Sequence, residues 1–221
     1  MYIHSSENTP SSSYSKCPFT IEVLGEGTVA AVPDRAVVVL GAATEGAVLQ
    51  TVQSDNAQIV TSLIESLMEL GIPKEKIQTY DFRIEAQYDY IEGQQVFRGY
   101  KATHLLQMTI DNIEDTGLVI DTAVSNGANS VTSIQFTVAQ PAIYENEALS
   151  LAIHNARQKA ETIAAALSVK LAAIPCQVQE LSRTAEPQPF SASLHMQSAA
   201  TPIEPGELSL SAFVRVWYLF G

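Results

Sequence analysis

The sequence has few of the residues that build metal or redox sites. Cys17 and Cys176 are the two cysteines in 221 residues, and they form no CxxC pair that would indicate a zinc or redox site. The histidines are His4, His104, His154 and His195. None stands at a metal-ligand spacing from another, and His195-Met196 offers two ligands, which make a weak site. We therefore expect no metal and no cofactor, while a redox role for the cysteines stays open.

Long apolar runs and basic residues are also scarce. No apolar run reaches the about 18 residues of a membrane helix, so no transmembrane segment is predicted. The 12 basic residues face 24 acidic ones, giving a net charge of −12, which argues against nucleic acid and anionic membranes as partners. Residues 1–16 lack the basic start and apolar segment of a secretory leader. The sequence as written favours the cytoplasm, and the periplasm or cell envelope is the alternative if a leader is missing.

Catalytic sets are missing as well. There is no nucleophile elbow and no Ser-His-Asp grouping. Gly25-Glu26-Gly27 lacks the Gly-Lys-Ser/Thr ending of a phosphate loop, so these glycines indicate a close backbone approach or a bulge in a strand. We expect no catalytic residues. The alternatives are a hydrolase-like site built from Asp81, Glu85 and His104 between two subdomains, and a metal or small-ligand site on a loop at 183–205.

A long alternating segment at 78–111 dominates what is present. It predicts two strands joined by a tight turn at Glu92-Gly93-Gln94, because apolar and polar residues alternate with a period of two. Phe82, Ile84, Ala86, Tyr88 and Tyr90 fall on one side. Each arm would extend about 45 Å at about 3.3 Å per residue, against about 5–6 residues for a common strand. Such a hairpin must cross two structural units or project beyond one.

The remaining periodicities predict an α+β fold with two α/β subdomains and mostly antiparallel sheets, in the order β-β-α-β-β-α-β-α-β-β with this hairpin at its centre. Residues 1–18 are expected to be a disordered tail. The first subdomain is expected at 19–95, with the first arm of the hairpin. The second is expected at 96–221, with a strand from 171 to 181 and a mobile loop at 183–205.

Three helices are expected, at 48–70, 113–125 and 141–167. The stripe of the first helix contains Asn56, whose amide is expected to bond to nearby backbone. Asp111 is expected to cap the second helix, with Glu114 completing a capping box. The third helix is expected to bury a seam whose alanine centre permits close packing on a sheet. The seam is Leu149, Ile153, Ala156, Ala160, Ile163 and Leu167.

Several short motifs resemble the SIMPL-domain family over about residues 19–220. They are Pro33-Asp34-Arg35-Ala36, Ile77-Gln78-Thr79-Tyr80, Gly99-Tyr100-Lys101-Ala102, Gly127-Ala128-Asn129, Ala156-Arg157-Gln158-Lys159-Ala160 and Pro202-Ile203-Glu204-Pro205-Gly206-Glu207-Leu208. The last is the most specific. The resemblance implies a two-part α+β fold, higher oligomers, and bacterial proteins exported to the periplasm or envelope with links to stress tolerance. It implies no catalytic residues.

The hypothesis that follows is a non-enzymatic binding or structural module that forms homo-oligomers through exposed strand edges. Exposed aromatic residues on a projecting element are typical of interfaces. The candidate interface residues are Tyr88, Tyr90, Phe97 and Tyr100 near the hairpin turn, and Phe213 and Trp217 on the last strand.

Overall fold

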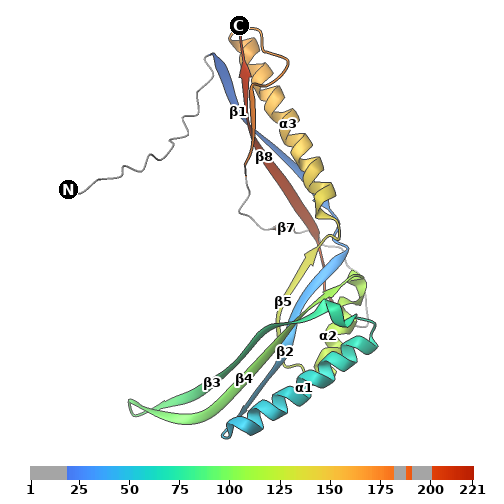
Figure 1. Ribbon diagram of the computed structural model, residues 1–221, viewed down its shortest axis with the longest axis vertical. Coiled ribbons are helices and arrows are strands. Elements are labelled where there is room, and N and C mark those ends of the chain that lie inside the picture. The colour runs from blue at the N-terminus through green and yellow to red at the C-terminus, as the bar shows by residue number, and fades with distance from the viewer. Residues whose placement is uncertain (1–18, 182–187, 191–200) are drawn as a thin grey trace, which may run out of the picture. The chain divides into compact units, whose positions relative to one another are not determined.

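The α+β class is confirmed in the computed structural model, which describes residues 19–181, 188–190 and 201–221 (Figure 1). The strands and helices, in chain order, are β1 (Thr20–Ala31), β2 (Arg35–Gly46), α1 (Leu49–Glu69), β3 (Ile77–Ile91), β4 (Gln94–Ile110), α2 (Thr116–Ser125), β5 (Ser130–Thr137), α3 (Pro141–Ala166), β6 (Gln177–Leu181), β7 (Gln188–Phe190) and β8 (Glu207–Leu219). Short 3-10 turns precede β3 (η1, Lys74–Lys76) and α2 (η2, Ile113–Asp115).

Two details of the strand assignment differ from expectation. The strand expected from 171 begins only at Gln177, and Leu171 makes an isolated bridge to Phe220. Pro175, which cannot donate to a ladder, separates the two. β7 lies where a loop was expected and pairs with β8. The tail at 1–18 and most of the loop at 183–205 fall outside the described residues.

Contacts divide the chain into two units that are each assembled from separate stretches. The first unit takes its described residues from 19–28, 146–184 and 211–221, and the second from 29–145 and 185–210. This corrects the expected boundary at 95/96, which would cut the ladder between β3 and β4. That ladder runs without a change of unit from Ile77 opposite Met108 to Ile91 opposite Gln94. The first and last strands also share a sheet, because β1 neighbours β8.

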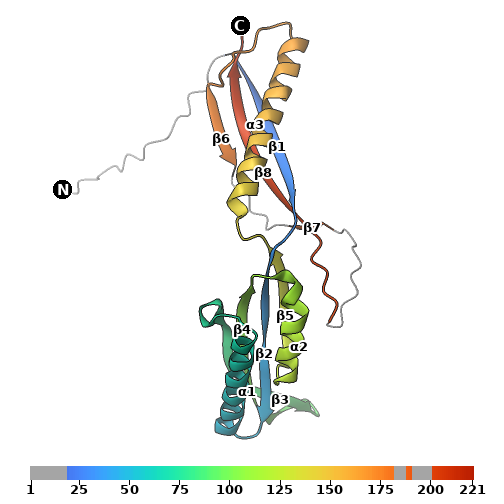
Figure 2. The ribbon, with the colours of Figure 1, turned by 90° about the vertical axis from the view of Figure 1, so that its right-hand side faces the viewer.

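In the first unit, α3 lies along one face of the sheet ordered β1-β8-β6 (Figure 2). The helix buries an alanine at every fourth position: Ala148, Ala152, Ala156, Ala160 and Ala164. Gly25 and Gly27 of β1 face this row. A Cβ on Gly25 would lie 2.1 Å from the Ala152 carbonyl oxygen, and one on Gly27 2.1 Å from the Ala148 carbonyl oxygen. Strand and helix backbones are therefore in direct contact, as the glycines predicted.

The buried seam of α3 differs from the expected one. Ile153 and Ile163 are 40% and 38% exposed, while Ala156 and Ala160 are fully buried. The row nearest the sheet must be made of the smallest side chains, because the backbones approach too closely for isoleucine. The larger apolar residues flank this row instead.

In the second unit, α1 and α2 pack on one face of the sheet ordered β3-β4-β2-β5. The core combines alternate residues of β2 and β4 with one face of each helix, including Leu40, Met108 and Leu63. Asn56 on α1 is buried, and its Nδ2 donates to the Ala42 carbonyl at 3.0 Å and the Ala102 carbonyl at 3.4 Å. The expected backbone role of this amide is confirmed.

Asp111 does not cap a helix. α2 begins only at Thr116, after η2, and has no side-chain cap. The Asp111 carboxylate instead accepts a hydrogen bond from Lys76 Nζ and lies 3.1 Å from Arg35 Nε. The Lys76 hydrogen bond holds the pKa of Asp111 below its ordinary value. The carboxylate thus links η1, β2 and the end of β4.

The segment that enters β8 is attached to α2 and to the core. The backbone N–H and the hydroxyl of Thr201 both donate to the carboxylate of Asp121, which lowers the pKa of Asp121. Ile203 packs against the core of the second unit. Gly206 has φ +62°, a conformation that glycine adopts without strain. These observations account for Ile203 and Gly206 of the 202–208 motif.

The contact of Gly27 with α3 can be tested by substitution. We expect Gly27→Ala to destabilise the chain by about 1–3 kcal/mol, the usual cost of adding a methyl group to a filled core. Urea denaturation would measure the change. Ala30→Val, which adds atoms at an exposed position of the same strand, is the matched control and should change little. A Gly27→Ala protein as stable as the parent would contradict the direct backbone contact.

The Asp121 bonds predict a pH dependence. Since the folded-state pKa lies below the unfolded value of about 3.9, these bonds stabilise the fold fully above about pH 4. The contribution is lost as pH falls through the folded-state pKa. We therefore expect the Tm of Asp121→Asn to lie below that of the parent at neutral pH, and the gap to close in acid. Asp55→Asn, at an exposed site on α1, should show no such gap. A gap that persisted unchanged in acid would refute the assignment.

Candidate functional site

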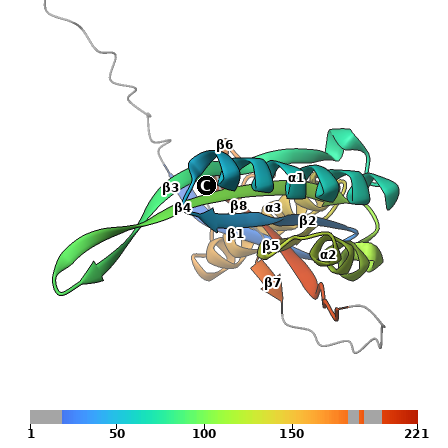
Figure 3. The ribbon, with the colours of Figure 1, turned by 90° about the horizontal axis from the view of Figure 1, so that it is seen from below.

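The β3–β4 hairpin extends past its neighbours in the second unit (Figures 1 and 3). β2 pairs with β4 only as far as Gly46 opposite Tyr100, whereas β3 and β4 remain paired to Ile91 opposite Gln94. Between these points the two arms pair only with each other. The hairpin therefore projects beyond one unit, the second of the two possibilities that its length allowed.

The end of the hairpin is closed by the turn that the sequence predicts. Glu92 and Gly93 form the connection, with φ +50° and +81°. Two successive residues with positive φ are typical of the tight turns whose twist matches that of paired strands. This geometry fixes the register of the two arms and hence which side chains share a face.

Aromatic side chains cover one face of the projecting part. Phe97 packs edge to face against Tyr88 and Tyr100, with ring centroids 5.8 and 5.2 Å away. Tyr88 and Phe97 are 47% and 46% exposed, and Tyr90 is 76% exposed. We name Tyr88, Tyr90, Phe97 and Tyr100 the aromatic surface. The structure brings these expected interface residues to the same end of the hairpin, on a half-exposed surface that suits a protein contact.

A bulge lies where the hairpin leaves β2. Gln87 is opposite Gly99 and Tyr88 is opposite Phe97, so Arg98 is an extra residue on β4. Gly99 has φ +155°, and a Cβ there would lie 2.6 Å from the Gly46 carbonyl oxygen. Bulges bend a strand and redirect side chains. Gly99 inside a strand pattern is the sequence signal for this bulge.

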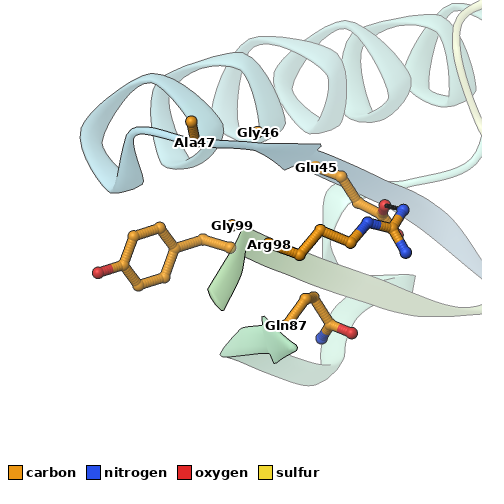
Figure 4. Close-up of a pocket in the computed structure, with 7 residues that line it drawn as sticks. Glu45, Gly46, Ala47, Gln87, Arg98 and Gly99 are labelled. Atoms are coloured by element: carbon orange, nitrogen blue, oxygen red, sulfur yellow. Dashed lines mark hydrogen bonds and ion pairs between the residues drawn. The ribbon is translucent and has the colours of Figure 1, made fainter. Parts of the chain in front are cut away.

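A shallow pocket of about 220 Å³ lies at this bulge (Figure 4). Its lining residues are Glu45, Gly46, Ala47, Gln87, Arg98, Gly99 and Tyr100. Arg98 and Lys101 both pair with the Glu45 carboxylate, at 3.1 and 3.2 Å. The charged groups therefore pair with one another. These ion pairs attach the hairpin to the end of β2.

The residues of the hydrolase-like alternative do not meet. Arg83 stands between Asp81 and Glu85 and pairs with each at 3.5 Å. His104 lies opposite Phe82 and stacks edge to face on its ring, 5.1 Å away. Since side chains alternate between faces along a strand, the histidine and the carboxylates project from opposite faces. Burial also lowers the pKa of His104, whose Nε2 lies 3.3 Å from the Thr79 hydroxyl.

The other candidate ligands are dispersed. His154 Nδ1 lies 2.7 Å from the Ser150 carbonyl on its own helix, and the backbone N–H of exposed Cys176 donates to the Trp217 carbonyl. His4, Cys17, His195 and Met196 lie outside the described residues. Within the described ranges, no three metal-ligating side chains cluster. None of the helices there combines the length and apolar character needed to span a bilayer.

Phe213 and Trp217 lie on a separate surface in the first unit, on the sheet face opposite α3. Trp217 Nε1 donates to Glu22 Oε2 at 3.1 Å, and Arg215 Nε lies 3.4 Å from Glu22 Oε1. The Arg215 guanidinium is 6.0 Å from the Trp217 ring centroid. We name Glu22, Phe213, Arg215 and Trp217 the outer face. Phe213 and Trp217 on this face are partly buried, unlike Tyr88, Tyr90 and Phe97 of the aromatic surface.

Comparison with known proteins gives a family and several relatives. The family described as "SIMPL: Protein of unknown function (DUF541)" matches residues 21–218. The chain is 28% identical over 210 residues to the 26 kDa periplasmic immunogenic protein of Brucella melitensis, covering 90% of this chain and 84% of that protein. It is 27% identical over 191 residues to the uncharacterized protein YggE of Escherichia coli K12, covering 86% of this chain and 76% of that protein.

The Brucella relative corrects the expected location. Residues 1–16 favoured the cytoplasm, but a relative that covers most of this chain is named as periplasmic. The cytoplasmic prediction is therefore wrong. It rested on the residues at the start of the chain, whereas the similarity extends over nearly all of it.

Proposed function

The chain belongs to the SIMPL family, and from that premise we propose that it is a non-enzymatic protein that assembles with copies of itself. The proposal places it in the bacterial periplasm or envelope, as the name of the Brucella relative indicates for that protein. Its role there is that of a binding or structural module linked to stress tolerance, as the family resemblance implies.

The aromatic surface carries the proposal. Tyr88, Tyr90 and Phe97 leave about half or more of their side-chain area in contact with water, on an element that extends past the core of its unit. Exposed aromatic clusters of this kind are enriched at protein interfaces, where rigid rings bury much area at little entropic cost. Covering them with a second copy would remove that area from water.

Three further observations support the proposal. The outer face provides a second aromatic surface, so one chain offers two contacts, and two contacts allow an assembly larger than a dimer. The separation of His104 from Asp81 and Glu85 leaves the hydrolase-like alternative without its catalytic grouping. The net charge of −12 would keep separate assemblies dispersed through mutual repulsion.

Light scattering after size exclusion tests self-assembly. We expect the purified chain to be oligomeric, and Tyr88→Ser/Phe97→Ser to weaken association by about 30-fold or more, since central aromatic contacts dominate interface energies. Circular dichroism should be nearly unchanged, because both residues lie beyond the core. Tyr80→Ser, at another exposed tyrosine of β3, is the matched control and should assemble normally. A parent protein that stays monomeric at its highest attainable concentration would end the proposal.

A further inference from the structure

The sheet edges of the molecule differ in their capacity to accept another strand. At the edge strand β1, Lys159 Nζ donates to the Leu24 carbonyl at 2.9 Å, and the Glu26 N–H donates to Asn155 Oδ1 at 3.2 Å. Both backbone groups lie on the edge where an added strand would need them. Side chains of α3 therefore close the middle of β1 to strand addition.

The remaining edges are short or irregular, except one. β6 has 5 residues, and β5 has 8 with a register shift that leaves Thr132 unpaired. β3 has 15 residues, stands at the end of its sheet, and is almost wholly exposed. Among the described residues, no side chain bonds to its backbone. Beyond the irregularity at Tyr80, β3 itself has no extra residue from Asp81 to Ile91, because the extra residue at the Gln87/Tyr88 register shift, Arg98, lies on β4.

We infer that this edge pairs antiparallel with β3 of a second copy, about a two-fold axis at Ala86. The pairing would join two four-stranded sheets into one continuous sheet. This inference rests on the proposed self-assembly and specifies its contact: the partner is the same strand of another chain, and the register is fixed.

The sequence of β3 selects the register. Centred on Ala86, the pairing places Phe82 opposite Tyr90 and Ile84 opposite Tyr88, so apolar residues meet on one face. On the other face, Arg83 of each chain lies opposite Asp89 of the other chain, so the contact contains two such pairs. Opposite charges and aromatic pairs at directly facing positions stabilise antiparallel strands. In one chain Arg83 is exposed and reaches its neighbouring carboxylates only at 3.5 Å, so it can turn to the partner.

Neighbouring registers are worse. If the axis lies at Arg83 or Glu85, that charged residue faces its own copy in the second chain. If the axis lies at Gln87, Glu85 faces Asp89. Like charges at facing positions are destabilising. Centring on Ile84 pairs Arg83 with Glu85, but it requires the irregular segment at Tyr80 to lie opposite Tyr88. Centring on Tyr88 leaves the charges without partners. Of these registers, only the one centred on Ala86 places opposite charges at facing positions without using the irregular segment at Tyr80.

Disulfide trapping tests the register in a Cys17→Ser/Cys176→Ser background. We expect Ala86→Cys to form a covalent dimer under mild oxidation, because facing Cβ atoms would be about 5 Å apart. Ile84→Cys is the matched control and should not form one alone, since its symmetry mate would lie about 13 Å along the strand at about 3.3 Å per residue. Mixing Ile84→Cys chains with Tyr88→Cys chains should restore the covalent dimer.

A charge exchange provides a second test that needs no cysteine. Arg83→Asp should weaken association about tenfold, because two pairs of like charges would then face each other. Arg83→Asp/Asp89→Arg in one chain should restore it.

The outcomes separate the inference from the proposal beneath it. A covalent dimer of Ile84→Cys but not of Ala86→Cys would overturn the register. An oligomer that none of these cysteines traps would overturn the strand pairing while self-assembly stands. A parent chain that light scattering finds monomeric would overturn both.

Discussion

The backbones of β1 and α3 touch without intervening side chains, and the first unit depends on that contact. Gly25 and Gly27 supply the space on the strand, and the alanine row of α3 supplies it on the helix. The close approach also has a second effect. It brings Lys159 and Asn155 within reach of the outer backbone groups of β1, so the packing that holds the helix in place also closes this edge. Stability and protection of the edge thus have a common origin.

The longest strand edge of the second unit, that of β3, differs from the edge of β1. Its helices cover β2 and β4, and the hairpin continues past them with aromatic residues on one face and charged residues on the other. An edge of this length, which no other described strand covers, usually invites uncontrolled strand pairing. The alternating charges of Asp81, Arg83, Glu85 and Asp89 limit that pairing to few registers. The charged residues that disfavour pairing of β3 with unrelated strands can therefore favour its pairing with β3 of a second copy.

The sequence predicted features that depend on local periodicity and missed those that depend on partners far away in the chain. The long hairpin followed from strict alternation between 78 and 111, and the close approach of β1 followed from two glycines in a strand pattern. The boundary at 95/96 failed because it cut the chain between paired strands. The predicted seam of α3 is right at Ala156 and Ala160 and wrong at Ile153 and Ile163, because the close contact requires alanine. Asp111 was assigned to a cap because its partners, Lys76 and Arg35, lie far away in sequence. The candidate interface residues remain a prediction, since only their exposure and grouping are seen in one chain.

The chain has a single tryptophan, and its position gives the molecule a built-in reporter. Trp217 belongs to the first unit and is hydrogen-bonded to Glu22 there, whereas the exposed tyrosines of the hairpin belong to the second. Indole emission therefore follows the melting of the first unit alone, and tyrosine emission is weighted toward the second. Comparing the two signals during denaturation would show whether the units melt together or in turn, without any label attached to the protein.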